Sequence, residues 1–136
     1  MIPPQAILTY YDGAYRPTIR IAIWAREDII RLQGLFTSLA DGSMQQIQLH
    51  TQEFLAVTDL HGLTLYITST TYKGGRNVRL QAISPDGPSF NWSRDVEGWL
   101  WCVGLLDGLI ENDGPGHQYL SGDGDDALVE VTFKES

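Results

Sequence analysis

Residues 95–109, DVEGWLWCVGLLDGL, decide the fold that we expect for this chain. Asp95 is a favourable N-cap, and Glu97 adds a negative charge in the first turn, so the pattern predicts that a helix begins here. At about 100° per residue, one broad apolar face forms, which comprises Val96, Trp99, Leu100, Val103, Leu106 and Ile110. We expect this face to pack against the protein's own sheet.

The opposite face of the same helix is apolar as well. It carries Trp101, Cys102, Leu105 and Leu109. A helix that is apolar all round is buried on both sides or lies in a membrane, and this run is shorter than the roughly 20 residues that span a bilayer. We therefore predict that Trp101, Leu105 and Leu109 form an interface, and that the protein is a homodimer or a larger oligomer.

Three glycines lie within this helix, namely Gly98, Gly104 and Gly108. Each costs about 0.8–1 kcal/mol relative to alanine in a helix interior. Because Gly104 and Gly108 are four residues apart, they predict the close approach of a neighbouring backbone. Two alternatives are a poor helix held by tertiary packing and a ligand in the glycine groove. The single cysteine, Cys102, is expected to be a small buried hydrophobic residue rather than a nucleophile.

Alternation and helical spacing predict the other elements. Strands are indicated at 18–24, 46–52 and 127–134, where apolar and polar residues alternate. A first helix over 27–40 is predicted by apolar residues at helical spacing, and Gly42 suits the left-handed position after it. These apolar residues are Ile29, Leu32, Phe36 and Leu39.

Short loops suggest how the strands are connected. Turn residues at 59–62, 73–77 and 85–88 predict three hairpins, and successive hairpins imply an antiparallel sheet. We therefore predict a single α+β domain over residues 1–136. Its expected architecture is two-layered, with a mainly antiparallel sheet of about six or seven strands and both helices packed on one face.

Charge is distributed unevenly along the chain. The net charge is −8 over 136 residues. Residues 1–94 hold seven acids and eight bases, whereas residues 95–136 hold ten acids and one base, Lys134. This asymmetry argues against nucleic acid as a partner, since such binding depends on Lys and Arg that neutralise phosphates. It is compatible with a basic protein partner or a cation.

The first residues, MIPPQAILTYYDG, contain neither a basic region nor a continuous apolar run, so they do not predict a signal peptide. No stretch is apolar over the length that a membrane span needs. A cytoplasmic protein without membrane association is the resulting expectation.

Residues 121–129, SGDGDDALV, resemble one nonapeptide of the calcium-binding RTX repeats. Gly122, Gly124, Asp126 and Leu128 match the repeat, whereas Ser121 departs from it. The resemblance covers nine residues, and no second repeat is present to stack on the first. It implies a calcium site in which Asp123, Asp125 and Asp126 are the candidate ligands.

A second candidate site surrounds His117, in the segment GPGHQYL at 114–120. With Asp113 and Tyr119, this histidine suggests a ligand-binding site, or a general base or metal ligand. No second histidine is nearby in sequence. H-E-x-x-H, G-x-S-x-G, P-loop and Rossmann motifs are all lacking, so we assign no catalytic residue and expect no cofactor.

Three classes of function remain. The favoured class is a non-enzymatic acidic interaction domain that self-associates. One concrete version of this class binds or neutralises a basic protein partner, in the manner of bacterial toxin-immunity proteins. The second is a small enzyme or ligand-binding domain with its site around His117 and the acidic loop at 111–126. The third is a calcium-binding module that uses residues 121–129.

Overall fold

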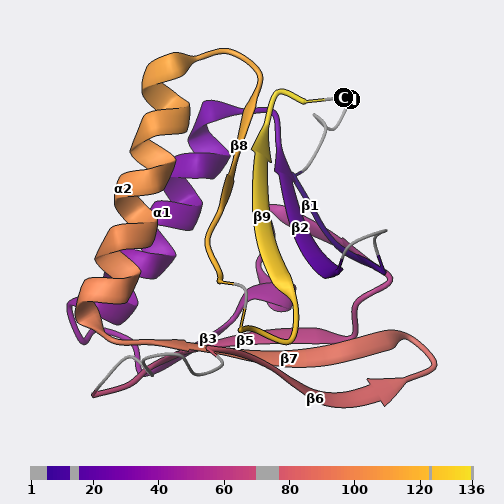
Figure 1. Ribbon diagram of the computed structural model, residues 1–136. Coiled ribbons are helices and arrows are strands. Elements are labelled where there is room, and N and C mark those ends of the chain that lie inside the picture. The colour runs from indigo at the N-terminus through magenta and orange to yellow at the C-terminus, as the bar shows by residue number, and fades with distance from the viewer. Residues whose placement is uncertain (1–5, 13–15, 70–76, 123, 136) are drawn as a thin grey trace.

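The computed structural model describes residues 6–12, 16–69, 77–122 and 124–135. Two helices pack against two mixed sheets, one of five strands and one of four (Figure 1). The helices are α1 (Arg26–Ala40) and α2 (Val96–Asn112), and a single 3-10 turn, η1, covers Leu49–Thr51. The strands are β1 (Ala6–Asp12), β2 (Pro17–Ile23), β3 (Gln46–Gln48), β4 (Leu55–Thr58), β5 (Gly62–Ile67), β6 (Val78–Ser84), β7 (Gly87–Arg94), β8 (Gly116–Tyr119) and β9 (Leu128–Phe133).

Both sheets contain parallel neighbours, so the prediction of one mainly antiparallel sheet is wrong. The five-stranded sheet has the order β4-β1-β2-β9-β8, and the four-stranded sheet has the order β3-β5-β7-β6. The pairs β1–β4, β2–β9 and β5–β7 are parallel. The α+β class itself is confirmed.

The error arises from the loops that we interpreted as hairpins. Of these three loops, only the one between β6 and β7 joins antiparallel neighbours. The loop at 59–61 instead carries the chain from β4 in one sheet to β5 in the other. The predicted loop at 73–77 lies almost wholly outside the described residues, but β5 and β6 are not neighbours because β7 lies between them. A short loop does not specify a hairpin when the chain changes sheet.

Helix α1 follows its sequence pattern. All four apolar residues predicted to face the core are fully buried. The helix ends at Asp41, and Gly42 has φ +83°, the left-handed conformation expected of it. Gln33 then links the two helices, since its Nε2 donates to the carbonyl of Val103 at 3.0 Å and to Asp107 Oδ1 at 2.8 Å.

Helix α2 has the predicted N-cap but a different buried face. Asp95 Oδ1 accepts a hydrogen bond from the Gly98 amide at 2.8 Å, which confirms the cap. Val96 and Leu100, expected in the core, are 47% and 50% exposed. The buried residues are instead Gly98, Trp99, Cys102, Leu106 and Leu109. Because α2 is apolar on nearly every side, its pattern does not fix its rotation about its own axis.

An aromatic cluster at the centre of the core sets that rotation. The ring of Trp99 lies 5.2 Å from that of Phe36 on α1 and 4.8 Å from that of Trp92 on β7. All three side chains are fully buried. Trp99 Nε1 also donates to the carbonyl of Tyr66 on β5 at 3.0 Å. The cluster therefore joins both helices to the four-stranded sheet.

Neither helix in the described part of the chain has the length and hydropathy that a membrane span requires.

Candidate functional site

The solvent-facing side of α2 combines exposed apolar side chains with acidic ones. Leu100 and Trp101 are 50% and 49% exposed, next to the exposed residues Glu97, Asp107 and Glu111. No lysine, arginine or histidine occurs between residues 96 and 112. We refer to these five residues as the α2 face. Large apolar groups that remain exposed beside polar residues are typical of contact surfaces.

The three residues predicted as an interface do not share one environment. Trp101 is exposed, and the Arg94 guanidinium carbon lies 4.9 Å from the centre of its ring. Leu105 is partly buried against the core. Leu109 is only 4% exposed, so its expected position on an outer surface is wrong. It belongs to the core because the rotation imposed by Trp99 directs it inward.

The glycines of α2 do not accommodate a neighbouring backbone within this chain. A Cβ atom at Gly104 or Gly108 would meet no atom within 4 Å, which contradicts our prediction of close packing there. At Gly98, in contrast, a Cβ would lie 2.5 Å from Arg94 Nε. The space beside Gly104 and Gly108 is therefore open to whatever approaches the helix from outside.

Substitution of Gly104 by alanine is expected to stabilise the isolated protein by about 0.8–1 kcal/mol, since alanine has the higher helix propensity and meets no obstruction. Urea unfolding followed by circular dichroism provides the measurement. Gly98→Ala is the control within the same helix, and it should give no gain because Arg94 must move. A destabilised Gly104→Ala variant would show that this position is obstructed.

The structure brings together two of the three residues predicted to bind a ligand. His117 and Tyr119 lie on β8, with their rings 5.6 Å apart. His117 Nδ1 is 3.1 Å from Glu135 Oε2. Asp113 is engaged separately, since its Oδ1 accepts from Lys134 Nζ at 2.8 Å, and this contact lowers the pKa of its carboxyl group.

A polar row continues from Tyr119 across the outer side of the five-stranded sheet. Arg20 Nε donates to Glu130 Oε1 at 2.8 Å, and its Nη2 donates to the Tyr11 hydroxyl at 2.8 Å. Partial burial raises the pKa of Tyr119, and the adjacent negative charge of Glu130 raises it further. Tyr119 therefore keeps its proton at neutral pH. Alternation placed Arg20 and Glu130 on polar sides of their strands, but the pairing of β2 with β9 was not visible in the sequence.

Carboxylates of the acidic loop before β9 accept hydrogen bonds from backbone amides at the edge of β6. Asp125 is 5% exposed. Its Oδ1 accepts from the backbone amides of Asn77 and Val78, at 2.5 and 2.9 Å, and its Oδ2 accepts from that of Gly122 at 2.7 Å. Asp126 Oδ2 accepts from the Leu80 amide at 2.9 Å. These carboxylates stabilise the loop through backbone N–H groups.

This arrangement bears on the predicted calcium ligands. Asp123 lies outside the described residues. The Asp125 oxygens face N–H donors, whose positive ends do not favour a cation at the same place. Where the structure is described, no three His, Cys, Asp or Glu side chains are grouped so as to hold a metal ion. Calcium binding thus rests on the sequence resemblance alone.

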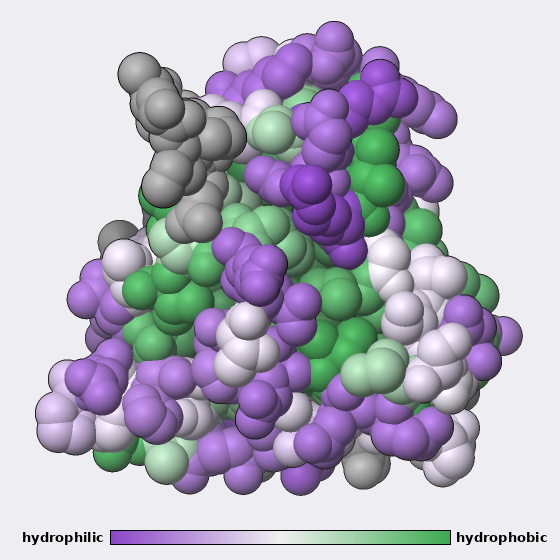
Figure 2. Space-filling model, turned by 180° about the vertical axis from the view of Figure 1, so that it is seen from behind, coloured by the Kyte–Doolittle hydropathy of each residue, from purple (hydrophilic) through white to green (hydrophobic). Residues whose placement is uncertain are grey.

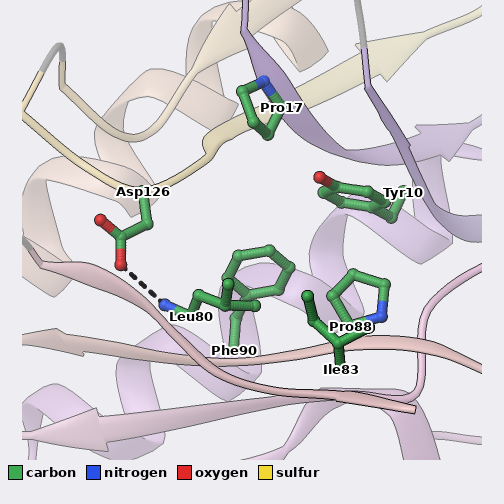
Figure 3. A pocket seen from close by; sticks show the side chains of 7 residues that line it. All are labelled: Tyr10, Pro17, Leu80, Ile83, Pro88, Phe90 and Asp126. Carbon is green, nitrogen blue, oxygen red and sulfur yellow. Dashed lines mark hydrogen bonds between the residues drawn. The ribbon is translucent and has the colours of Figure 1, made fainter.

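A cleft opens between the two sheets, at the end where β1 and β2 face β6 and β7. Its volume is about 450 Å³. Figure 3 shows side chains from both sheets pointing toward the same space, with Asp126 at one side of it. The lining residues of this inter-sheet cleft are Tyr10, Pro17, Leu80, Ile83, Pro88, Phe90 and Asp126. No pattern in the sequence indicated it, because its two walls come from strands that are distant in the chain.

Hydrophobic surface is also visible from behind the molecule. In that view it reaches solvent across the middle of the face and is interrupted by hydrophilic residues (Figure 2). Leu80 and Ile83, which line the inter-sheet cleft, are 43% and 78% exposed. The apolar surface of this protein is therefore not confined to α2.

Cys102 is expected to resist thiol reagents while the protein is folded. Its side chain is fully buried, and burial raises the pKa of the thiol to about 12. At pH 8 the thiolate, which is the reactive form, is therefore about 10⁻⁴ of the total. Reaction with Ellman's reagent should be slow in buffer and complete in denaturant. Rapid labelling in buffer would contradict the buried position.

Comparisons with known proteins identify no relative from which a role can be transferred. No family model, curated protein or solved structure matches this chain. Function must therefore be argued from the surfaces described above.

Proposed function

We propose that this protein is a non-enzymatic interaction domain that binds a basic protein partner through the α2 face. The observation that carries the proposal is the half exposure of Trp101 and Leu100 on a helix whose charged residues are all acidic. Neutralisation of a basic partner, as bacterial toxin-immunity proteins perform it, is a concrete form of this role.

Residue types on the α2 face suit such an interaction. Tryptophan is enriched among the residues that dominate binding energy at interfaces, and it buries about 150–250 Å². Glu97, Asp107 and Glu111 surround it with negative charge, which accelerates the encounter with a basic partner and disfavours acidic ones. The open space beside Gly104 and Gly108 would let a partner's backbone approach the helix closely.

Self-association through the same face is the second candidate, favoured by the two half-exposed apolar side chains. In a two-fold dimer, however, the same acidic residues of both copies lie around one contact. Added salt should therefore strengthen the dimer by screening like charges, whereas it should weaken a complex with a basic partner. The direction of the salt effect distinguishes the two candidates.

Binding of a synthetic amphipathic peptide made of lysine and leucine tests the proposal, with a glutamate–leucine peptide of the same pattern as its control. Of the two peptides, we expect only the lysine peptide to shift the amide NMR signals of α2. Trp101→Glu should weaken the binding of this peptide at least tenfold. Because the variant adds a negative charge, a lysine peptide held only by non-specific electrostatic attraction would bind the variant more tightly than the wild type. Either that result or shifts confined to other elements would contradict the proposal.

Sedimentation at micromolar concentration examines self-association. A species of 15.2 kDa is the monomer, and finding only this species would exclude the second candidate. A dimer that dissociates on Trp101→Glu, while that variant remains folded, would support it. Ile83→Glu, an exposed position on β6 rather than on α2, is the matched control and should leave the oligomeric state unchanged.

A further inference from the structure

No residue of α2 lines the inter-sheet cleft, which is therefore independent of the function proposed for that helix. We propose that it is a binding site for a small, uncharged and mostly apolar molecule that carries a hydrogen-bond acceptor. Its volume of about 450 Å³ falls within the range of small-molecule sites, about 300–1,000 Å³. The supporting features are the fixed walls, the lining and one hydroxyl group.

The walls of the cleft are held by backbone contacts. The amide of His61 donates to the carbonyl of Pro88 at 2.9 Å, and the amide of Asp126 donates to that of Val78 at 2.9 Å. Gly87 packs so closely on the loop between β4 and β5 that an added Cβ would lie 2.5 Å from the Asp59 carbonyl oxygen. These contacts preform the cleft, so a ligand need not order its walls on binding.

The lining selects a flat apolar molecule. Tyr10 and Phe90 stand on opposite sheets with ring centres 5.6 Å apart and planes inclined by 35°. Pro17, Pro88 and Ile83 complete the apolar wall (Figure 3). Because these two rings contact each other, a planar ligand would lie beside them and against the aliphatic groups rather than between the rings.

One hydroxyl group gives the site a polar anchor. In Figure 3 the Tyr10 hydroxyl points into the open space between Pro17 and Phe90, and it makes no hydrogen bond within the described residues. Partial burial raises the pKa of Tyr10, and the negative charge of Asp12 raises it further. The group therefore stays an O–H donor that an acceptor on the ligand can satisfy. The carboxylates of Asp12 and Asp126 disfavour an anionic ligand.

Amide NMR titrations with acetophenone, ethylbenzene and benzoate test this assignment. These probes share one ring but carry, respectively, a carbonyl acceptor, no acceptor and a negative charge. We expect saturable shifts at Leu80, Ile83 and Phe90 with the two neutral probes, and much weaker shifts with benzoate. Tyr10→Phe should weaken the binding of acetophenone about fivefold, which corresponds to the loss of one hydrogen bond of about 1 kcal/mol. The affinity for ethylbenzene should change by less than about twofold.

Two further variants establish the location. Leu80→Glu and Ile83→Glu should each weaken the binding of both neutral probes at least tenfold. Leu100 lies on α2 and is about as exposed as Leu80, and Leu100→Glu should have no effect on this binding. Because Ile83 is 78% exposed, its variant is expected to fold normally. The proposal is overturned if the neutral probes give no saturable shifts at the cleft, if Tyr10→Phe weakens both equally, or if Leu100→Glu alone abolishes binding.

Discussion

Replacement of Trp99 by alanine is expected to lower the free energy of unfolding by about 3–5 kcal/mol. The indole is fully buried between Phe36 and Trp92, and its Nε1 donates to the carbonyl of Tyr66. Alanine would leave a cavity where the two helices meet the four-stranded sheet. It would also leave the partly buried Tyr66 carbonyl without this hydrogen bond, which adds to the loss. Urea unfolding followed by circular dichroism measures the change.

The matched control is Trp101→Ala, two residues further along the same helix. Because Trp101 is 49% exposed, its loss should cost less than about 1 kcal/mol. The two variants thus separate a tryptophan that holds the fold from one available to a partner. Similar losses of stability for both would contradict the orientation of α2 and, with it, the α2 face.

The second large effect is expected at Asp125. Replacement by alanine removes the acceptors of three backbone N–H groups, those of Asn77, Val78 and Gly122. An unsatisfied buried donor costs about 1–3 kcal/mol, and solvent can reach some of these groups once the loop moves. We therefore expect a loss of about 2–5 kcal/mol in the free energy of unfolding, measured by urea denaturation.

Asp125→Asn should lose less than Asp125→Ala, because the amide oxygen retains one acceptor. Asp86→Ala removes a carboxylate that is 83% exposed and should change stability by no more than about 0.5 kcal/mol. Millimolar calcium is expected to leave the melting temperature of the wild type almost unchanged, because the Asp125 oxygens already accept hydrogen bonds from backbone N–H groups. An Asp125→Ala variant as stable as the wild type would show that the loop is not fastened by this carboxylate.

Local patterns in the sequence were reliable where a single element sufficed to interpret them. The helical spacing of Ile29, Leu32, Phe36 and Leu39 predicted α1 and its buried face. Asp95 predicted the start of α2, and alternation indicated β2 and β9. In each case the signal comes from neighbours in the chain, whose geometry is set by the helical or strand repeat.

The candidate surfaces were only partly foreseen. Trp101 was correctly expected outside the core, whereas Leu109 was not. His117 and Tyr119 lie side by side because they are two residues apart on one strand, whereas Asp113 binds Lys134. The inter-sheet cleft was missed altogether. Tyr10 and Phe90, which line it from different sheets and whose rings contact each other, are eighty positions apart in the chain.

The sequence by itself determined the helices, most strands, the α+β class and the acidic character of the C-terminal third. Only the tertiary structure decided the division into two sheets, the parallel pairings and the rotation of α2. The physical reason is the same in each case. Secondary structure follows from local spacing and capping, whereas pairing and rotation depend on contacts between distant segments. In α2 the apolar surface permitted several rotations, and the packing of Trp99 against Phe36 and Trp92 selected one of them.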